Sequence, residues 1–265
     1  PGRAGVAARF AGGDEIRAAL VVAADGAGSA LRRGARIASR GWDYDAASLL
    51  TTVALEQPHD GRAVQHFLEG GPLALLPLPG RRASVIWTER RLAARRLHEA
   101  GDAVFLATLQ ARLGDRFGTL APAGGRAMQP LRLQVAAAMT GERLALIGDA
   151  AHVLHPLAGQ GLNLGFADVA ALAEAVVDAA RLGQDVGAMD VLAAYRSRRR
   201  FDVMTMVAAT DGLARLFAAR GAKARALRDA GMGLVDRAPR LKDRIVEAAA
   251  GVGAAAPRLL RGEAL

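Results

Sequence analysis

The stretch Leu144–Gly165, LALIGDAAHVLHPLAGQGLNLG, decides the expected fold. Its first four residues, Leu144 to Ile147, form a short apolar run that predicts a buried strand. The run stops at Gly148 and Asp149, so a carboxylate stands at the carboxyl end of that strand. A glycine-bearing loop then leads into a long alanine-rich segment that predicts a helix. This order is typical of open α/β sheets, which bind their ligands at the carboxyl ends of strands.

The loop indicates what kind of ligand would fit. Gly159, Gly161 and Gly165 allow the backbone to approach a ligand closely, and the N–H groups that begin a helix favour an electron-rich partner. The Asp149 carboxylate accepts hydrogen bonds from sugar-like hydroxyls. A polyol joined to an electron-poor ring meets these conditions, and a flavin is such a molecule. The alternative is a plain strand–loop–helix whose glycines serve only the turn.

A second strand-to-helix element lies earlier, in Leu20–Arg32, LVVAADGAGSALR. An apolar run again ends at an acidic residue and a glycine, here Asp25 and Gly26. Ser29 is placed to cap the helix that follows, and Arg32 offers a cation for a phosphate. The alternative is an ordinary Asp-Gly turn.

The stretch around Asp149 resembles the second FAD-binding motif of the group A flavoprotein monooxygenases, the para-hydroxybenzoate hydroxylase-like family. In that family the Asp contacts the ribityl chain, and the loop from Pro to Asn lies along the flavin ring. The Asp25 element is similar to the family's Asp-Gly motif, which serves the flavin and the nucleotide pyrophosphate. The resemblance implies a cofactor-binding set of Asp25, Gly26, Arg32, Gly148, Asp149, Pro156, Gly159, Gln160, Gly161, Leu162 and Asn163. It assigns no catalytic side chain.

Further segments are similar to the ubiquinone-biosynthesis hydroxylases of that family. They include Gly41–Tyr44, Pro58–Gly61, Gly71–Leu78 and Tyr195–Asp202, which we interpret as signatures of the substrate domain. The resemblance implies a flavoprotein monooxygenase, an oxidoreductase that hydroxylates a polyprenyl phenol-type ring with FAD, NAD(P)H and O2. Alternatives are a prenyl reductase or another aromatic hydroxylase of the same fold, or an inactive fragment that acts only as an interaction module.

The expected fold class is α/β, mixed with α+β: a Rossmann-like FAD-binding domain, an inserted antiparallel-sheet substrate domain and C-terminal helices. We expect FAD-binding parts at residues 1–41 and 129–183, the substrate domain at 42–128 and a helical region at 184–265. The family begins with a Gly-x-Gly-x-x-Gly turn that holds the ADP half of FAD, and this sequence has no such fingerprint. We therefore expect a fragment whose first βαβ unit is missing.

Periodicity predicts the remaining elements. Alternating or apolar runs predict strands at 48–55, 63–68, 73–78, 84–88 and 130–137. Helices are expected at 92–113, at 163–182 with Gly183 as its C-cap, and from about Met189 to Phe217. Arg199 falls on the apolar stripe of the last helix, so we expect it to pair with a carboxylate.

Composition excludes several classes of function. The 265 residues include no cysteine, which excludes disulfides, thiolate metal sites and a cysteine-linked flavin, and fits a reducing compartment. The net charge of +9 comes almost wholly from arginine, without the aromatic platform that nucleic-acid binding requires. His152 and His155 are spaced as a metal pair, but Asp149 alone lies near them, so no metal site is expected.

One charged segment suggests a location. Residues 220–243 carry seven arginines or lysines against three aspartates, with apolar side chains between them. Such a segment either rests on anionic lipid or forms a solvated helix. We expect a cytoplasmic protein, in the first case peripheral on the inner face of the membrane, where a polyprenylated substrate would lie.

Overall fold

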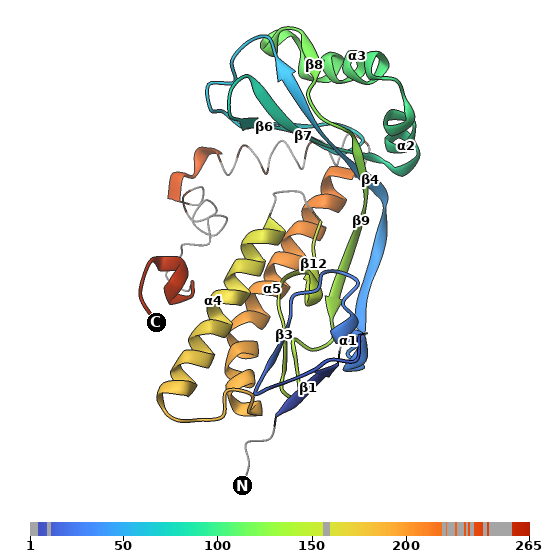
Figure 1. Ribbon diagram of the computed structural model, residues 1–265. Coiled ribbons are helices and arrows are strands. Elements are labelled where there is room, and N and C mark those ends of the chain that lie inside the picture. The colour runs from blue at the N-terminus through green and yellow to red at the C-terminus, as the bar shows by residue number, and fades with distance from the viewer. Residues whose placement is uncertain are drawn as a thin grey trace. The chain divides into compact units, whose positions relative to one another are not determined.

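The structure is a computed structural model that describes residues 5–9, 12–155, 160–218, 221, 226, 231, 233, 236–240, 243 and 256–265 (Figure 1). The chain divides into two compact units. Unit 1 comprises Pro1–Trp42, Leu133–Leu213 and Arg225–Leu265; unit 2 comprises Asp43–Arg132 and Ala214–Ala224. The domain boundaries expected from the sequence stay a prediction.

A parallel pair of strands forms the centre of unit 1. Strand β3 (Val21–Ala23) pairs in parallel with β11 (Leu144–Leu146), and β10 (Thr140–Gly141) pairs antiparallel on the other side of β11. All three residues of β11 are buried, as the apolar run predicts. Both strands are followed by short helical elements, and the further short elements of this unit are β1 (Val6–Arg9), β2 (Glu15–Ala18), α1 (Ala30–Gly34), the 3-10 turn η2 (Gly148–Ala150) and β12 (His152–Val153).

Two long helices, α4 (Gln160–Arg181) and α5 (Met189–Ala218), follow in the chain and run side by side in Figure 1. Both were predicted from periodicity. Helix α4 is closed by Gly183, whose φ of +66° is left-handed and whose N–H donates to the Ala180 carbonyl. The predicted C-cap is therefore confirmed. The last described helical turn is η4 (Arg258–Arg261). Its Arg258 donates hydrogen bonds to the Glu174 and Asp178 carboxylates of α4.

Unit 2 is an antiparallel sheet with two helices. Its strands are the long β4 (Ser39–Leu55), β5 (Val64–Phe67), β6 (Pro72–Leu78), β7 (Arg82–Arg90), β8 (Leu120–Pro122) and β9 (Ala127–Ala136). The sheet order is β12-β9-β4-β7-β6-β5, with β8 paired to β4; β4 and β9 each begin in one unit and end in the other. Alternate residues of β7 and β6 are fully buried and form the apolar core with Phe105 and Leu109.

The structure corrects two predicted elements. The single helix expected at 92–113 is two helices, α2 (Arg91–Glu99) and α3 (Asp102–Leu113), because Ala100 and Gly101 are extended between them. Glycine is a poor helix former, and the apolar stripe alone does not reveal such a break. Strand β4 begins at Ser39, nine residues before the predicted start at 48, because its first part is exposed and carries no alternating pattern. The expected mixed α/β class is confirmed.

Candidate functional site

The two acidic motifs leave neighbouring strands at the same edge of the sheet in unit 1. The parallel register aligns Leu146 of β11 with Ala23 of β3, and the Ile147 N–H donates to the Ala23 carbonyl at 3.0 Å. Asp25 and Asp149 therefore follow strand ends that lie side by side. The carboxyl edge of a parallel sheet is where α/β proteins bind their ligands. The sequence predicted each motif separately, and the fold brings them together.

The Asp149 turn is tight and open to solvent. Gly148 has a left-handed φ of +55°, and the Ala151 N–H donates back to its carbonyl at 2.8 Å. A Cβ on Gly165 would lie 3.4 Å from the Gly148 Cα, so the turn and helix α4 approach each other through two glycines. The Asp149 side chain is exposed. Within the described part of the chain, it makes no hydrogen bond or ion pair. Its oxygens are thus available to a ligand.

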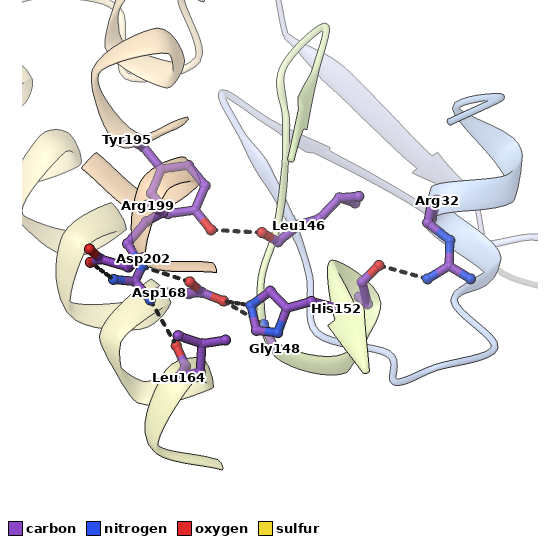
Figure 2. Close-up of polar contacts among 10 residues, drawn as sticks. Arg32, Leu146, Gly148, His152, Leu164, Asp168, Tyr195, Arg199 and Asp202 are labelled. Carbon is purple, nitrogen blue, oxygen red and sulfur yellow. Dashed lines mark hydrogen bonds and ion pairs between the residues drawn. The ribbon is translucent and has the colours of Figure 1, made fainter. Parts of the chain in front are cut away.

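A second carboxylate, on helix α4, is hydrogen-bonded to this turn beside Gly148 and His152 (Figure 2). Asp168 of α4 is 0% exposed and accepts hydrogen bonds from three directions. One carboxylate oxygen accepts the Gly148 N–H at 3.0 Å and His152 Nε2 at 2.6 Å, and the other accepts Arg199 Nε at 2.8 Å. Because a carboxylate only accepts, His152 carries a hydrogen on Nε2. Three buried side chains, from β12, α4 and α5, thus form one cluster with the half-buried Gly148 amide of the turn.

Helix α5 supplies one cation and one hydroxyl to this region. Arg199, 2% exposed, also donates to Asp202 at 2.6 Å and to the Leu164 carbonyl at 3.4 Å. Tyr195 lies one turn earlier, and its hydroxyl donates to the Leu146 carbonyl at 2.8 Å. Burial, reinforced by the Asp168 charge, raises the Tyr195 pKa far above its ordinary value, so the hydroxyl stays a neutral donor. The expected pairing of Arg199 with a carboxylate is confirmed.

The Tyr195–Asp202 segment, matched as a signature of the family, lies on helix α5 within unit 1. Its buried side chains contact the end of β11 and the Asp168 cluster. The substrate-domain role that we expect for it stays a prediction.

Asp25 has partners of its own. Its carboxylate accepts the N–H groups of Ala30 at 2.8 Å and Leu31 at 3.2 Å, and so caps the start of α1. Burial pushes the Asp25 pKa upward, but hydrogen bonds from Ser29 and from these amides outweigh it, and the pKa lies below its ordinary value. The predicted cap by Ser29 is confirmed, since its hydroxyl accepts the Arg32 N–H at 2.9 Å. A contact from Asp25 to FAD stays a prediction.

Arg32 joins the two motifs. Its guanidinium, on a residue 5% exposed, donates to the Ala150 carbonyl at 2.7 Å (Figure 2). It also donates to the Ala27 carbonyl at 2.7 Å. These bonds tie the Asp-Gly loop, which follows β3, to the turn that carries Asp149. The observed partners are backbone carbonyls, so the phosphate role expected for Arg32 stays a prediction. The cofactor contact expected for Gly26 also stays a prediction. Among the described residues, no atom lies within 4 Å of a Cβ built on Gly26.

The flavin-ring loop is described in part. Pro156 and Gly159 lie outside the described residues, whereas Gln160–Asn163 form the first turn of α4. Leu162 is 67% exposed, and among the described residues no atom lies within 4 Å of a Cβ built on Gly161. This first turn carries no acidic residue that would offset the attraction of its N–H groups for electron-rich ligand atoms. An open glycine, a helix start and an exposed carboxylate without a partner in the described part of the chain fit a flavin.

Asp168 is the residue that sequence reasoning missed. It stands in the apolar run Phe166–Leu172, and a carboxylate on a buried helix face must be paired. That signal was available, but the sequence did not say which group pairs with it. His152 received no role either, and the structure makes it one of the donors to Asp168.

Two negative findings apply to the described part of the chain. Within it, no three His, Asp or Glu side chains gather as a metal site, and burial lowers the pKa of His155 despite the opposing charge of Asp211. Among the same residues, no helix combines the length and the apolar character needed to cross a lipid bilayer. Most of the basic segment 220–243 lies outside the described residues.

Comparisons with known proteins show the family. Residues 3–210 match the family model described as FAD binding domain. The chain belongs to this FAD-binding family. It is 45% identical over 261 residues to the ubiquinone hydroxylase UbiL of Rhodospirillum rubrum, covering 97% of this chain and 61% of the relative. It is 35% identical to the 3-demethoxyubiquinol 3-hydroxylase of Escherichia coli, covering 91% of this chain and 61% of that protein.

A more distant relative and solved structures extend the likeness. The human mitochondrial ubiquinone biosynthesis monooxygenase COQ6 is 32% identical, over 88% of this chain and 57% of its own length. The structure of PqsL from Pseudomonas aeruginosa in complex with 2-aminobenzoylacetate is similar with a TM-score of 0.62 and 27% identity, over 80% of this chain and 59% of that one. The p-nitrophenol 4-monooxygenase PnpA, at 0.71 and 22%, covers 92% of this chain and 62% of its own, and shares the fold. This chain thus spans about three fifths of the curated relatives' length.

Proposed function

We propose that the chain is part of an FAD-dependent hydroxylase of ubiquinone biosynthesis, which acts on a polyprenyl phenol-type ring with NAD(P)H and O2. The observation that carries the proposal is the Asp149 carboxylate, which is exposed at the carboxyl edge of a parallel strand pair and has no partner among the described residues. Family membership supports the cofactor, and the names of the relatives from Rhodospirillum rubrum and Escherichia coli support the substrate class.

The residues of the chain bind and orient. Asp149 accepts hydrogen bonds from the ribityl hydroxyls, and Gly148 and Gly161 let backbone lie against the cofactor. The first turn of α4, at Gln160–Asn163, would lie against the flavin ring, while Asp25, Gly26 and Arg32 would serve its nucleotide side. When bound, FAD would use NAD(P)H and O2 to transfer one oxygen atom to the aromatic ring of the substrate. The protein then contributes position and a dry site, and no side chain is assigned as acid or base.

Replacement of the ribityl contact tests the cofactor assignment. In the intact protein, Asp149→Ala is expected to weaken FAD affinity about tenfold or more, because removing a hydrogen bond to a charged acceptor costs roughly 1.5–3 kcal/mol. The measurement is the dissociation constant from quenching of flavin fluorescence, with the exposed Glu142→Gln as control. Equal affinity of the Asp149→Ala variant and the unchanged protein would refute the assignment.

Isotopic oxygen tests the reaction. With ¹⁸O2, NADH or NADPH and a polyprenyl phenol, the product is expected to gain one labelled oxygen, detected by mass spectrometry. A reductase of the same fold would saturate a prenyl double bond and incorporate no label. An inactive fragment that acts only as an interaction module would leave the phenol unchanged and would show no bound flavin.

We also propose that the basic segment 220–243 places the protein peripherally on anionic lipid at the cytoplasmic face of a membrane. The supporting observation is its excess of arginine and lysine between apolar residues. Sedimentation with vesicles that contain increasing phosphatidylglycerol is expected to carry the protein down in proportion to anionic lipid. Sedimentation that ignores lipid charge would exclude this contact.

A further inference from the structure

The polar cluster beneath the Asp149 turn has a geometry that packing alone does not require. Asp168 accepts the Gly148 N–H, and Gly148 directly precedes Asp149 in a turn of three residues. This amide belongs to the peptide between Ile147 and Gly148, so the hydrogen bond fixes the start of the turn one residue before Asp149, where Gly148 has no side chain to hold it. An apolar residue at position 168 would leave the Gly148 amide without that acceptor, which is costly in a buried site.

The same cluster reaches the other half of the proposed flavin site. Arg199, which donates to Asp168, also donates to the Leu164 carbonyl in the first turns of α4. These turns begin with Gln160–Asn163, the residues proposed to lie along the flavin ring. One carboxylate and its arginine therefore connect the ribityl-binding turn, the start of α4 and helix α5.

Energetics indicate what the cluster is for. A buried ion pair gives little net stability compared with well-packed apolar residues, because both charges lose their hydration. A site that must hold a ligand gains from side chains and backbone locked by a second layer of hydrogen bonds. Three charged or polar side chains are at most 2% exposed here: Asp168, His152 and Arg199. Their burial is therefore explained by the need to hold the backbone of the Asp149 turn in one conformation.

We propose that Asp168, oriented by Arg199 and His152, is a positioning residue for the flavin: it holds the Gly148 amide and thereby directs the Asp149 carboxylate toward the ribityl chain. This inference rests on the proposed function. Asp168 itself is buried and touches no ligand; it acts through the turn.

The test compares two buried carboxylates on one helix. Glu174 lies six residues after Asp168, about 9 Å along α4, and pairs with Arg198 and Arg258 without reaching the turn. In the intact protein, Asp168→Asn is expected to weaken FAD binding about 10- to 100-fold, the range seen when outer-layer partners of a bound group are removed. Glu174→Gln is expected to lower the unfolding midpoint and to leave FAD affinity unchanged.

A spectroscopic readout and a rescue separate positioning from stability. At saturating FAD, Asp168→Asn is expected to change the visible circular dichroism of the bound flavin, whereas Glu174→Gln is not. His152→Gln keeps an N–H donor for Asp168 and is expected to retain FAD affinity, while His152→Leu, which lacks it, is expected to lose affinity. This second pair decides the question if Asp168→Asn does not fold.

The outcomes distinguish the inference from the proposed function. An unchanged protein that binds no FAD would overturn the function. Normal binding by the unchanged protein, together with equal FAD affinity and equal flavin dichroism in Asp168→Asn and Glu174→Gln, would overturn the positioning role alone. Equal loss in His152→Gln and His152→Leu would also count against it, since the donor to Asp168 would then be irrelevant.

Discussion

In unit 2 the sheet is covered by apolar side chains, whereas in unit 1 the turn that carries Asp149 lies on buried charges. Leu73, Leu75, Val85 and Trp87 are fully buried, and Trp87 packs against Phe105 with ring centroids 6.1 Å apart. Asp168 and Arg199 are buried to the same extent, but they make directed hydrogen bonds. Apolar packing stabilises without direction, while hydrogen bonds fix where a backbone group points. The directed hydrogen bonds therefore hold the backbone in place at the turn where the ligand is proposed to bind.

Breaking the charged cluster is expected to have the largest effect. Arg199→Met leaves the buried Asp168 carboxylate without its cation, and loss of one partner of a buried pair costs about 3–5 kcal/mol. The change is measured as a lower free energy of unfolding in urea. The exposed pair of Arg95 and Glu99 is the control, because Glu99→Gln is expected to give no measurable change. A loss of unfolding free energy below about 1 kcal/mol for Arg199→Met would contradict this prediction, because the buried Asp168 carboxylate would then not need Arg199.

Creating a cavity in the apolar core of unit 2 is expected to destabilise the protein somewhat less than breaking the charged cluster. Leu75→Ala removes a fully buried side chain between β5 and β7 and is expected to cost about 3 kcal/mol. Because no charge is involved, the loss should be the same at every pH from 5 to 8, measured by urea unfolding across that range. A loss that varies with pH would contradict the contrast drawn between the two units.

The smallest expected effect concerns the cap at Asp25. Asp25→Ala removes the acceptor for the Ala30 and Leu31 amides and is expected to cost about 1 kcal/mol at neutral pH. The pKa of Asp25 is lowered on folding from an ordinary value of 3.8, so its contribution is present above that pH and is lost as the pH falls through the lowered pKa. The difference in unfolding free energy between the two proteins should therefore shrink below about pH 4. A difference that stays constant down to pH 2 would contradict this role.

Prediction from the sequence succeeded where neighbours along the chain decide the outcome. The apolar run at Leu144–Leu146, the cap at Ser29 and the C-cap at Gly183 each depend on a few adjacent residues. It failed at the break after Glu99, where an apolar stripe continued across a glycine, and at the exposed first part of β4. The contacts of the cofactor-binding set with FAD remain predictions that rest on resemblance.

The sequence by itself determined the strand–turn–helix signatures, the two acidic motifs and the family, because these are local patterns of residue type and spacing. Only the tertiary structure decided which groups meet: Asp168 pairs with Arg199 31 residues away, and Tyr195 donates to Leu146 49 residues away. With 35 lysines and arginines and 26 acidic residues in the chain, pattern alone cannot select one such pair. The choice is made when α4 and α5 pack beside the strand ends, because a buried charge must find its partner within hydrogen-bond distance.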